Sequence, residues 1–467
     1  MALSNLSMEK QRTIEKETSI EGVGLHTGQK VKLTFKPALD NHGIVFQRAD
    51  LEGQPKVQAI ADNVTEVERG TTIEKKEAKV NTVEHVMASL VALKIDNCLI
   101  EMNGQEVPIM DGSSKPFVEL LKAAGVKFLN EDRKVYIVKE TIIYKDEVRG
   151  VELMVVPDDS YSVTAMIDYN SPVLGTQHAT LDKIEDFEEN IASARTFCFL
   201  HELELLLNHN LIKGGDLSNA IVLVDKVVSQ QELDKLAGLF NREKIEVKSE
   251  GILNNLELRH KNEPARHKLL DVVGDLGLVG APIQGKIIAK RPGHAANVEF
   301  AKLIRKKMEA EKNAVPRFDL TKTLYDINKI MTLLPHRPPF LMVDRILEME
   351  QERIVGSKNV TINETFFQGH FPGQPVFPGV LQLEAMAQVG GILALSQVPD
   401  PENYLTYFMK IDKVKFRQQV VPGDTLVFEL KFVTPFRRGI VHMAGYAYVG
   451  DKIVSEAEMM AQLAKVK

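Results

Sequence analysis

The feature that most constrains the fold is a charged segment that interrupts the chain at about two thirds of its length. "KLIRKKMEAEKNAVPRFDL" runs from Lys302 to Leu320, and its late proline is typical of a helix that ends in a linker. The 467-residue chain is also too long for a single hydrophobic core. We therefore expect separately folded modules of roughly 300 and 145 residues on either side.

The N-terminal module carries an internal repeat. "IEKETSI" (14–20) followed by "VKLTFKP" (31–37) parallels "IVKETII" (137–143) followed by "VELMVVP" (151–157). Each pair forms two alternating β-type runs, and amphipathic helices follow. These predicted helices span residues 82–93, 114–125, 191–209 and 264–280. The pattern predicts an α+β module with two similar domains, 1–130 and 131–305, packed on each other as a layered sandwich.

The C-terminal module combines one long apolar helix with several alternating runs. The helix is "PGVLQLEAMAQVGGILALSQ" (378–397), and the runs include "TLVFELKFV" (425–433) and "IVHMAGYAYV" (440–449). A single central helix wrapped by an antiparallel sheet fits this pattern. We predict such a domain over residues 325–467, joined to the first module by a linker over 306–324.

Composition and charge narrow the class of protein. Hydrophobic residues make up 44% and charged residues 26%, as in ordinary globular proteins, and a net charge of −6 argues against a nucleic-acid partner. No apolar stretch is long enough to span a bilayer, and the N-terminus lacks the apolar core of a secretory signal. Cys98 and Cys198 lie in apolar contexts and are interpreted as buried thiols of a reducing compartment. We expect a cytoplasmic protein.

A candidate metal site combines two distant segments. His267, Asp271 and Asp275 recur at i, i+4 and i+8, so they share one face of the helix predicted over 264–280. A His and an Asp one turn apart can bind one zinc ion, and His85 would be a third ligand that leaves the fourth position open for water. Glu84, beside His85, would then take a proton from that water.

Alternative interpretations exist for these residues. The His-x-x-x-Asp spacing alone is more often an ordinary helical i,i+4 pair. Asp275 favours the metal interpretation, because an unpaired carboxylate on an otherwise apolar helix would be costly. His294 follows Pro-Gly and precedes a predicted helix, which suits a side chain presented to a site, but an exposed loop histidine fits equally well.

Several motifs make the first module resemble a known family. The segments that match in family order are "GVGLHTG" (22–28), "TVEH" (82–85), "EVPIMDGSS" (106–114), "ARTF" (194–197), "GGDLSNAIVL" (214–223), "RHKLLDVVGDL" (266–276) and "GHAAN" (293–297). They resemble UDP-3-O-acyl-N-acetylglucosamine deacetylase, the zinc enzyme of lipid A synthesis, over residues 8 to 305. The stretch between Thr196 and His267 looks longer than in the family, with the extra residues within 224–250.

The resemblance implies roles for individual side chains. His85, His267 and Asp271 would bind one Zn²⁺, and Glu84 would be the general base. The other implied roles concern the oxyanion, the leaving amine and the nucleotide sugar. Thr196 would hydrogen-bond the oxyanion, Lys268 would face the nucleotide sugar, and His294, oriented by Asp275, would stabilise the oxyanion and protonate the amine. Such amide hydrolysis needs a Lewis acid, a base and a proton donor.

A second constellation lies in "FFQGHFPGQPVFPGVLQLEAMAQ". His370 is in a Gly/Pro-rich loop, Gly379 starts the apolar helix, and Glu384 is expected to be buried inside that helix and held protonated. Free N–H groups at the helix start favour a partial negative charge. Together these groups can polarise a thioester carbonyl, remove an α-proton and protonate a departing β-hydroxyl. An ordinary helix start with one tolerated glutamate explains the residues equally well.

The C-terminal module resembles a second family. "LPHRPPFLMVDRI" (334–346), "GHFPGQPVFPGVLQLEAMAQ" (369–388) and "DKVKFRQQVVPGDTL" (412–426) look like the FabZ-type (3R)-hydroxyacyl-[acyl-carrier-protein] dehydratase. The resemblance implies a hotdog fold with sites at a dimer interface, and often a trimer of dimers. His370 would be the base, Glu384 the acid, and Gly379 would offer its N–H to the thioester oxygen.

The favoured hypothesis is a fusion of two enzymes with one zinc ion in its first half. Its substrates would be UDP-3-O-(3-hydroxyacyl)-N-acetylglucosamine and 3-hydroxyacyl chains on acyl carrier protein. Two His nitrogens and one carboxylate oxygen also suit iron. One alternative is a different zinc amidohydrolase joined to a hotdog thioesterase. Another is an assembly protein whose hotdog half only oligomerises.

Overall fold

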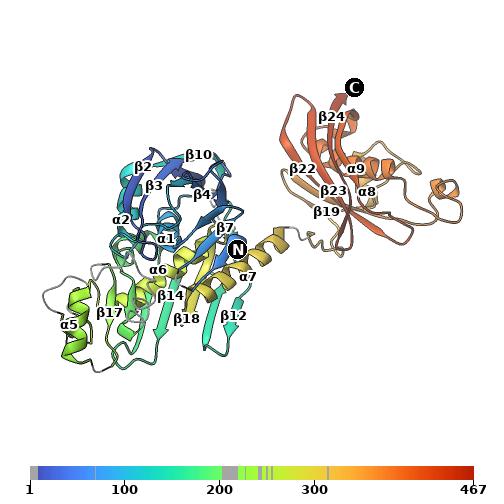
Figure 1. The fold of residues 1–467 in the computed structure, drawn as a ribbon. Coiled ribbons are helices and arrows are strands. Elements are labelled where there is room, and N and C mark those ends of the chain that lie inside the picture. The colour runs from blue at the N-terminus through green and yellow to red at the C-terminus, as the bar shows by residue number, and fades with distance from the viewer. Residues whose placement is uncertain are drawn as a thin grey trace. The chain divides into compact units, whose positions relative to one another are not determined.

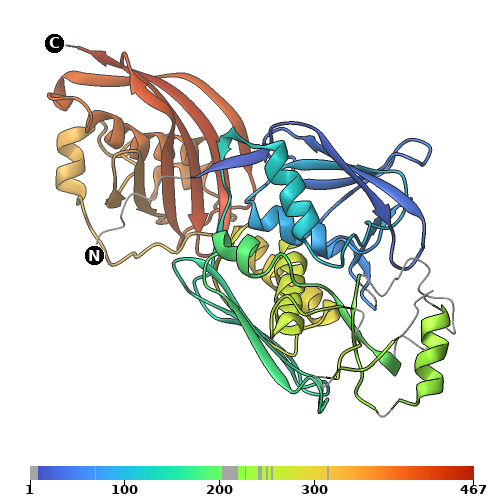
Figure 2. The same cartoon turned by 90° about the vertical axis from the view of Figure 1, so that its left-hand side faces the viewer.

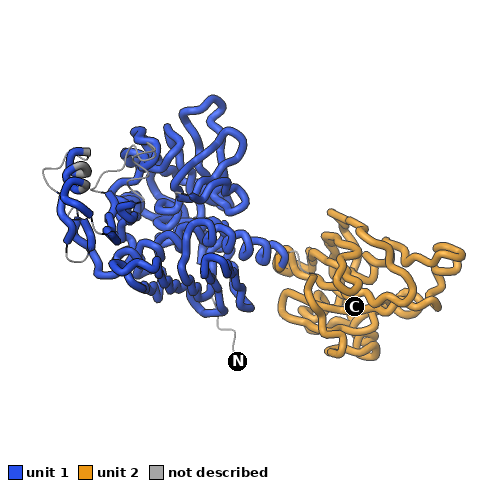
Figure 3. The backbone as a smooth tube through the Cα atoms, turned by 60° about the horizontal axis from the view of Figure 1, so that its bottom comes forward, with its two compact units in different colours: residues 1–310 blue, residues 311–467 orange. Residues whose placement is uncertain are grey.

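The chain divides into two compact units, Met1–Ala310 and Glu311–Lys467, which Figure 3 distinguishes by colour. The computed structural model describes residues 9–68, 70–201, 219–226, 228–239, 245–248, 251–253, 256–312 and 315–466.

The two largest sheets of unit 1 have the same topology. The first consists, in spatial order, of β2 (Thr18–Val23), β3 (Lys30–Pro37), β9 (Cys98–Met102), β4 (Ile44–Arg48) and β5 (Lys56–Gln58). The second consists of β12 (Ile142–Asp146), β13 (Val151–Val156), β18 (Ile283–Lys290), β14 (Tyr161–Asp168) and β15 (Thr176–Leu181), with β11 (Tyr136–Ile137) beside β18. In each, the central strand is antiparallel to one neighbour and parallel to the other. The predicted pair of similar α+β domains is confirmed.

Alternating side chains explain why each sheet covers helices on one face. Leu33 and Phe35 on β3, and Leu153 and Val155 on β13, are fully buried, whereas the residues between them are exposed or half-buried. A period of two places these apolar side chains on one face of each strand. Both sheets therefore present an apolar face to the interior of unit 1.

Helices fill the space between the two sheets, as Figures 1 and 2 show. They are α1 (Glu84–Ala92), α2 (Lys115–Ala124), α6 (Glu263–Gly277) and α7 (His294–Lys312). In each half, one helix leads into the central strand, α1 into β9 and α6 into β18, and the other follows that strand. The layered sandwich predicted from the repeat is therefore confirmed.

Glycines allow α1 and α6 to approach each other closely. A Cβ atom on Gly274 would lie 2.1 Å from the carbonyl oxygen of Glu84, and one on Gly277 would lie 2.9 Å from Val91. A glycine inside a helix usually costs stability, so its presence here has a packing reason. The contact of α1 with α6 brings together residues that are far apart in the sequence.

Short elements complete unit 1. They are β1 (Lys10–Ile14) paired with β10 (Val126–Asp132), a sheet of β6 (Val64–Glu66), β7 (Thr72–Lys75) and β8 (Ala78–Val80), the short helices η1 (Ala61–Asn63), η2 (Ile184–Asp186) and α3 (Phe187–Asn190), the parallel pair β16 (Phe197–Phe199) and β17 (Ile221–Leu223), and α5 (Gln230–Leu239). The last of these, α5, lies in the apparent insert and packs with β17 in a small separate core.

The helix predicted over 191–209 is wrong for residues 191–199, whereas Leu200 and His201 are helical. Phe197–Phe199 forms β16, because its backbone pairs with β17 instead of within its own turn. The remainder of that predicted helix, from residue 202 on, lies outside the described residues. Cys98 is buried as predicted, but Cys198 on β16 is partly exposed, and the two thiols form no disulfide.

Unit 2 is one antiparallel sheet that curves around a central helix, the hotdog fold predicted from the sequence. Its strands, in spatial order, are β19 (Arg345–Met349), β20 (Arg353–Asn359), β22 (Thr425–Arg437), β23 (Ile440–Val449), β24 (Lys452–Lys465) and β21 (Tyr404–Phe416). The helices are the central α9 (Gly379–Leu395) and the short α8 (Ile327–Leu333), η3 (Thr365–Gln368) and η4 (Pro401–Asn403). A Cβ on Gly390 of α9 would lie 2.8 Å from Leu430, so this glycine lets the helix sit close on the sheet.

Part of the predicted linker packs on unit 2. Val315 and Phe318 join a small apolar cluster with residues of β19, β20, β22, β23 and β24, and the Phe318 ring lies 5.2 Å from the ring of Tyr448. The Leu324 N–H donates to the carbonyl of Ile346. The part of the linker prediction before Lys312 is helical, since α7 ends at that residue.

Among the described residues, none of the helices combines the length and the apolar composition that a membrane crossing requires.

Gly274→Ala is expected to destabilise unit 1 by about 1–3 kcal/mol, because the added methyl group must push α1 away from α6. Gly238→Ala is the matched control, since Gly238 is also helical but has no neighbouring atom within 4 Å of the added Cβ. Thermal unfolding of both variants measures the difference. Equal unfolding temperatures for the two variants would contradict the close helix contact.

Phe318→Ser in the full chain is expected to destabilise unit 2 by about 1–2 kcal/mol, because it removes a half-buried aromatic ring from its apolar contacts. Leu320→Ser is the control, because Leu320 is 41% exposed. Chemical denaturation followed by tyrosine fluorescence compares the two. If both variants unfold at the same denaturant concentration, the packing of this segment does not contribute to stability.

Candidate active sites

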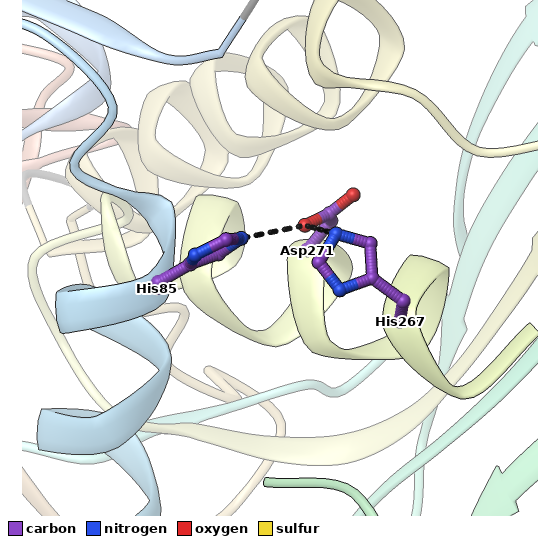
Figure 4. Close-up of side chains that lie close together, drawn as sticks. All are labelled: His85, His267 and Asp271. Carbon is purple, nitrogen blue, oxygen red and sulfur yellow. Dashed lines mark ion pairs between the residues drawn. The ribbon is translucent and has the colours of Figure 1, made fainter. Parts of the chain in front are cut away.

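Three of the predicted side chains meet in the interior of unit 1. One ligand atom from each of His85, His267 and Asp271 lies within 4.8 Å of the others, and all three residues are buried. Figure 4 shows His85 reaching from α1 toward Asp271, which shares α6 with His267. The Asp271 Oδ1 atom is 3.8 Å from His85 Nε2 and 3.4 Å from His267 Nε2. The three residues form a candidate metal site.

The imidazoles of His85 and His267 are both uncharged. His267 Nδ1 lies 3.1 Å from the carbonyl oxygen of Ala194, so that nitrogen carries the proton and Nε2 keeps its lone pair toward Asp271. Burial lowers the pKa of His267, and burial together with the neighbouring His267 ring lowers the pKa of His85 to about 3. Neutral imidazole is the form that binds a metal ion.

The Asp271 carboxylate is also suited to binding a metal ion. Its Oδ1 atom is buried and accepts no hydrogen bond among the described residues, while Oδ2 accepts one of 2.9 Å from the Lys268 ammonium. Burial opposes ionisation, but the positive charges of Lys268 and His294 and the imidazole of His267 hold the pKa of Asp271 below its usual range. A buried, ionised oxygen without a donor is costly unless a cation satisfies it. The donor set therefore suits one divalent ion with an open position.

Glu84 borders this cluster from the first turn of α1. Its Oε2 atom accepts a hydrogen bond of 2.9 Å from the backbone N–H of Thr71. Burial raises the pKa of Glu84 to about 7, although the charge of His294 opposes this shift. A carboxyl group with such a pKa can both accept and release a proton near neutral pH.

His294 and Asp275 form a buried pair on the other side of the cluster. His294 Nδ1 lies 3.0 Å from Asp275 Oδ2, and His294 Nε2 lies 3.8 Å from Asp271 Oδ2. Burial alone would lower the pKa of His294, but the carboxylates of Asp275 and Asp271 raise it to about 9. The imidazole is therefore protonated at neutral pH and can donate a proton.

Lys268 and Thr196 are placed differently from each other. Lys268 lies in the cluster, where the Asp271 carboxylate keeps its pKa above the usual value despite burial. The Thr196 backbone N–H donates to the carbonyl of Gly112 over 2.8 Å, which fixes the segment two residues beyond Ala194. Within the described part of the chain, no hydrogen bond joins the Thr196 hydroxyl to the other predicted site residues.

The structure adds three residues that sequence reasoning missed. Thr71 and Asn297 donate to Asp275, and Gly274 allows α1 to approach α6. Asn297 follows His294 by three residues on one helix, so its spacing could have indicated it. The interior position of Gly274 was a similar signal. Nothing in the local sequence distinguishes Thr71.

The second constellation is only partly assembled within one chain. His370 Nδ1 lies 2.7 Å from the carbonyl oxygen of Val376, which fixes the orientation of the ring. The Glu384 carboxylate accepts a hydrogen bond of 2.9 Å from Gln388 and retains 19% exposure, so it is less buried in the single chain than predicted. Both residues are described, and no hydrogen bond or ion pair joins them. Unit 2 alone does not pair these two groups.

Gly379 is the first residue of α9, as predicted. A Cβ atom there would lie 2.7 Å from the ring of Phe416, so no larger residue fits without moving that ring. Pro378 precedes it and cannot donate a backbone hydrogen bond. The Gly379 N–H is one of the helix-start donors that an oxygen of a ligand can use.

The edge strand of the unit 2 sheet exposes several large apolar side chains between charged ones. β21 forms the outer strand beside β24, and large apolar side chains on it are between 40% and 55% exposed. They are Tyr407, Phe408, Met409, Ile411 and Phe416. Long apolar edge strands are normally covered, because their free N–H and C=O groups pair readily with another strand.

Comparison with known proteins agrees with this division into two units. The family profile of LpxC, UDP-3-O-acyl N-acetylglycosamine deacetylase, matches residues 11–245 and 236–306, two segments that meet inside the apparent insert. The profile of the FabA-like domain matches residues 334–458.

Three similar proteins are each named bifunctional enzyme LpxC/FabZ. The protein of Bacteroides thetaiotaomicron is 51% identical over 98% of this chain and 100% of the relative. The protein of Porphyromonas gingivalis is 49% identical over the same shares, and that of Chlorobaculum tepidum is 46% identical over 98% of this chain and 99% of the relative. The chain therefore belongs to the bifunctional LpxC/FabZ family, with its LpxC region in unit 1 and its FabA-like region in unit 2.

Proposed function

We propose that the chain is a bifunctional enzyme of lipid A and fatty acid synthesis. Unit 1 removes the N-acetyl group of UDP-3-O-(3-hydroxyacyl)-N-acetylglucosamine, and unit 2 dehydrates (3R)-3-hydroxyacyl-[acyl-carrier-protein] to the trans-2-enoyl product. The observation that carries the first activity is the buried cluster of His85, His267 and Asp271 between Glu84 and His294. Two thiols without a disulfide suit a cytoplasmic location.

The proposed cofactor is one zinc ion held by His85, His267 and Asp271. Such an ion supplies Lewis acidity toward a carbonyl oxygen and makes water more acidic. Two neutral imidazoles and one carboxylate match the usual ligands of catalytic zinc. The orphaned Oδ1 atom of Asp271 supports a cation at this position.

The surrounding residues divide the proton transfers between them. Glu84 takes the proton of the attacking water, which its raised pKa allows at neutral pH. His294, protonated and oriented by Asp275, stabilises the oxyanion and then protonates the nitrogen of the leaving amine. Thr196 donates a further hydrogen bond to the oxyanion, and Lys268 contacts the nucleotide-sugar side of the substrate.

In unit 2, we propose that His370 removes the α-proton and that Glu384 protonates the departing hydroxyl. The Gly379 N–H would donate a hydrogen bond to the thioester oxygen. The site is proposed to form across a homodimer in which β21 strands of two chains pair. The exposed apolar side chains of β21 support this interface, as does the lack of a hydrogen bond or ion pair between the described residues His370 and Glu384. Further assembly into a trimer of dimers belongs to the same proposal.

His267→Ala tests the deacetylase. It is expected to abolish stoichiometric zinc binding and lower deacetylation by roughly 100- to 1,000-fold, as loss of one transition-state-stabilising group does. Metal analysis and a deacetylation assay measure this, and chelation followed by added zinc should abolish and restore the wild-type activity. His178→Ala, exposed on β15, is the control.

Dehydration by the same His267→Ala chain should stay within about twofold of wild type, because unit 2 carries that activity on a core of its own. A fully active variant without bound zinc would refute the metal proposal.

Co-expression of two inactive variants tests the proposed dehydratase and its proposed dimer. His370→Ala and Glu384→Gln are each expected to lose dehydration but keep deacetylation. Co-expressed, they should recover about one quarter of wild-type dehydration, because half of the dimers are mixed and each contains one intact site. Enoyl-product absorbance measures the rate. A mixture as inactive as its components would show that both residues serve the same chain's site or act elsewhere.

A further inference from the structure

Thr71 has no role in the mechanism proposed above, but it contacts two residues that do. These are Glu84, the proposed base, and Asp275, which orients the proposed acid His294. The Thr71 backbone N–H donates to Glu84 Oε2 over 2.9 Å, and its hydroxyl donates to Asp275 Oδ1 over 2.5 Å. The hydroxyl also lies 3.4 Å from His294 Nδ1. Thr71 is fully buried, so water does not compete for these contacts.

The backbone around Thr71 is held in place independently of its side chain. The carbonyl of Thr71 accepts a hydrogen bond from the Val83 N–H at the start of α1. Gly70 before it has φ +143°, and a Cβ there would lie 2.9 Å from Glu84 Oε1. Only glycine therefore lets this segment approach the Glu84 carboxylate so closely. Thr71 thus has a fixed position relative to α1.

The contact with Asp275 connects that fixed position to α6 and α7. Asp275 accepts from Thr71 on Oδ1, and from His294 and Asn297 on Oδ2. With Oδ1 held, the carboxylate cannot rotate, and Oδ2 stays directed at His294 Nδ1. The opposite ring nitrogen, Nε2, then stays near the reaction centre, 3.8 Å from Asp271 Oδ2.

We propose that Thr71 is a positioning residue for deacetylation, which fixes the distance between the proton acceptor Glu84 and the proton donor His294. The inference rests on the proposed activity of unit 1. Glu84 reaches the site from α1, whereas His294 reaches it from α7. Thr71 joins them through its backbone bond to Glu84 and its hydroxyl bond to Asp275, which in turn holds His294.

The test replaces the hydroxyl without changing the shape of the side chain. Thr71→Val in the full chain removes the bond to Asp275, and Thr71→Ser restores a hydroxyl. Thr72→Val is the matched control, because Thr72 is also buried but its hydroxyl faces Asn81. Each variant is assayed for kcat and KM of deacetylation, zinc content, thermal unfolding, and dehydration by unit 2 of the same chain.

Thr71→Val should lower kcat by roughly 10- to 100-fold, the usual cost when a catalytic group is no longer held in place. Its KM and zinc content should stay within about twofold, since the contacts of the metal ligands are unchanged. Thr71→Ser should recover most of kcat, and Thr72→Val should match wild type. A merely structural role predicts instead a loss of folded protein with an unchanged kcat per zinc-loaded chain.

Two results would overturn the proposal: a Thr71→Val enzyme with wild-type kcat, or a Thr71→Ser enzyme as impaired as Thr71→Val. If Thr71→Val does not fold, Thr71→Ala takes its place, and a wild-type kcat there overturns the proposal equally. Failure of the proposed function would look different, since the wild-type chain itself would then not deacetylate the substrate while still binding zinc.

Discussion

The close packing of α1 against α6 is the interaction on which unit 1 depends. Glu84 and His85 belong to α1, whereas His267, Asp271 and Asp275 belong to α6, so the cluster exists only where these helices touch. Gly274 brings the backbones together, because any side chain there would collide with the carbonyl of Glu84. The two helices hold equivalent places in two similar domains. The candidate site therefore lies between two equivalent helices, although α1 and α6 contribute different residues to it.

The chemical properties of the candidate site in unit 1 follow from the burial of its charged groups. Three carboxyl groups, Glu84, Asp271 and Asp275, lie beside two cations, Lys268 and protonated His294, with little access to water. Buried charges are tolerated only when they are paired or bind a metal ion. The Asp271 Oδ1 atom accepts no hydrogen bond among the described residues, which favours a further cation there. The same surroundings shift the pKa values of Glu84 and His294, because burial makes Glu84 a weaker acid while neighbouring carboxylates keep His294 protonated.

Unit 2 differs from unit 1, because the residues of its proposed site are not all brought together within one chain. Its central helix is well buried, and Gly379 presents a helix-start N–H beside Phe416. No hydrogen bond or ion pair joins the described residues His370 and Glu384 within the chain, and the edge strand β21 pairs with β24 on one side only. The homodimer that we propose would explain both features.

Regular patterns in the sequence determined much of this protein. The repeated strand pairs predicted two similar domains, the 3.6-residue period placed His267, Asp271 and Asp275 on one face, and a long apolar helix predicted the centre of unit 2. Local spacing determines such features because the backbone geometry of helices and strands is the same in every protein. Only the tertiary structure decided that His85 meets α6, that Ala194 orients His267, and that Thr71 joins Glu84 to Asp275. It also decided that Phe197–Phe199 is a strand. These contacts arise between segments far apart in the chain, where packing and hydrogen-bond partners, and not local periodicity, select the conformation.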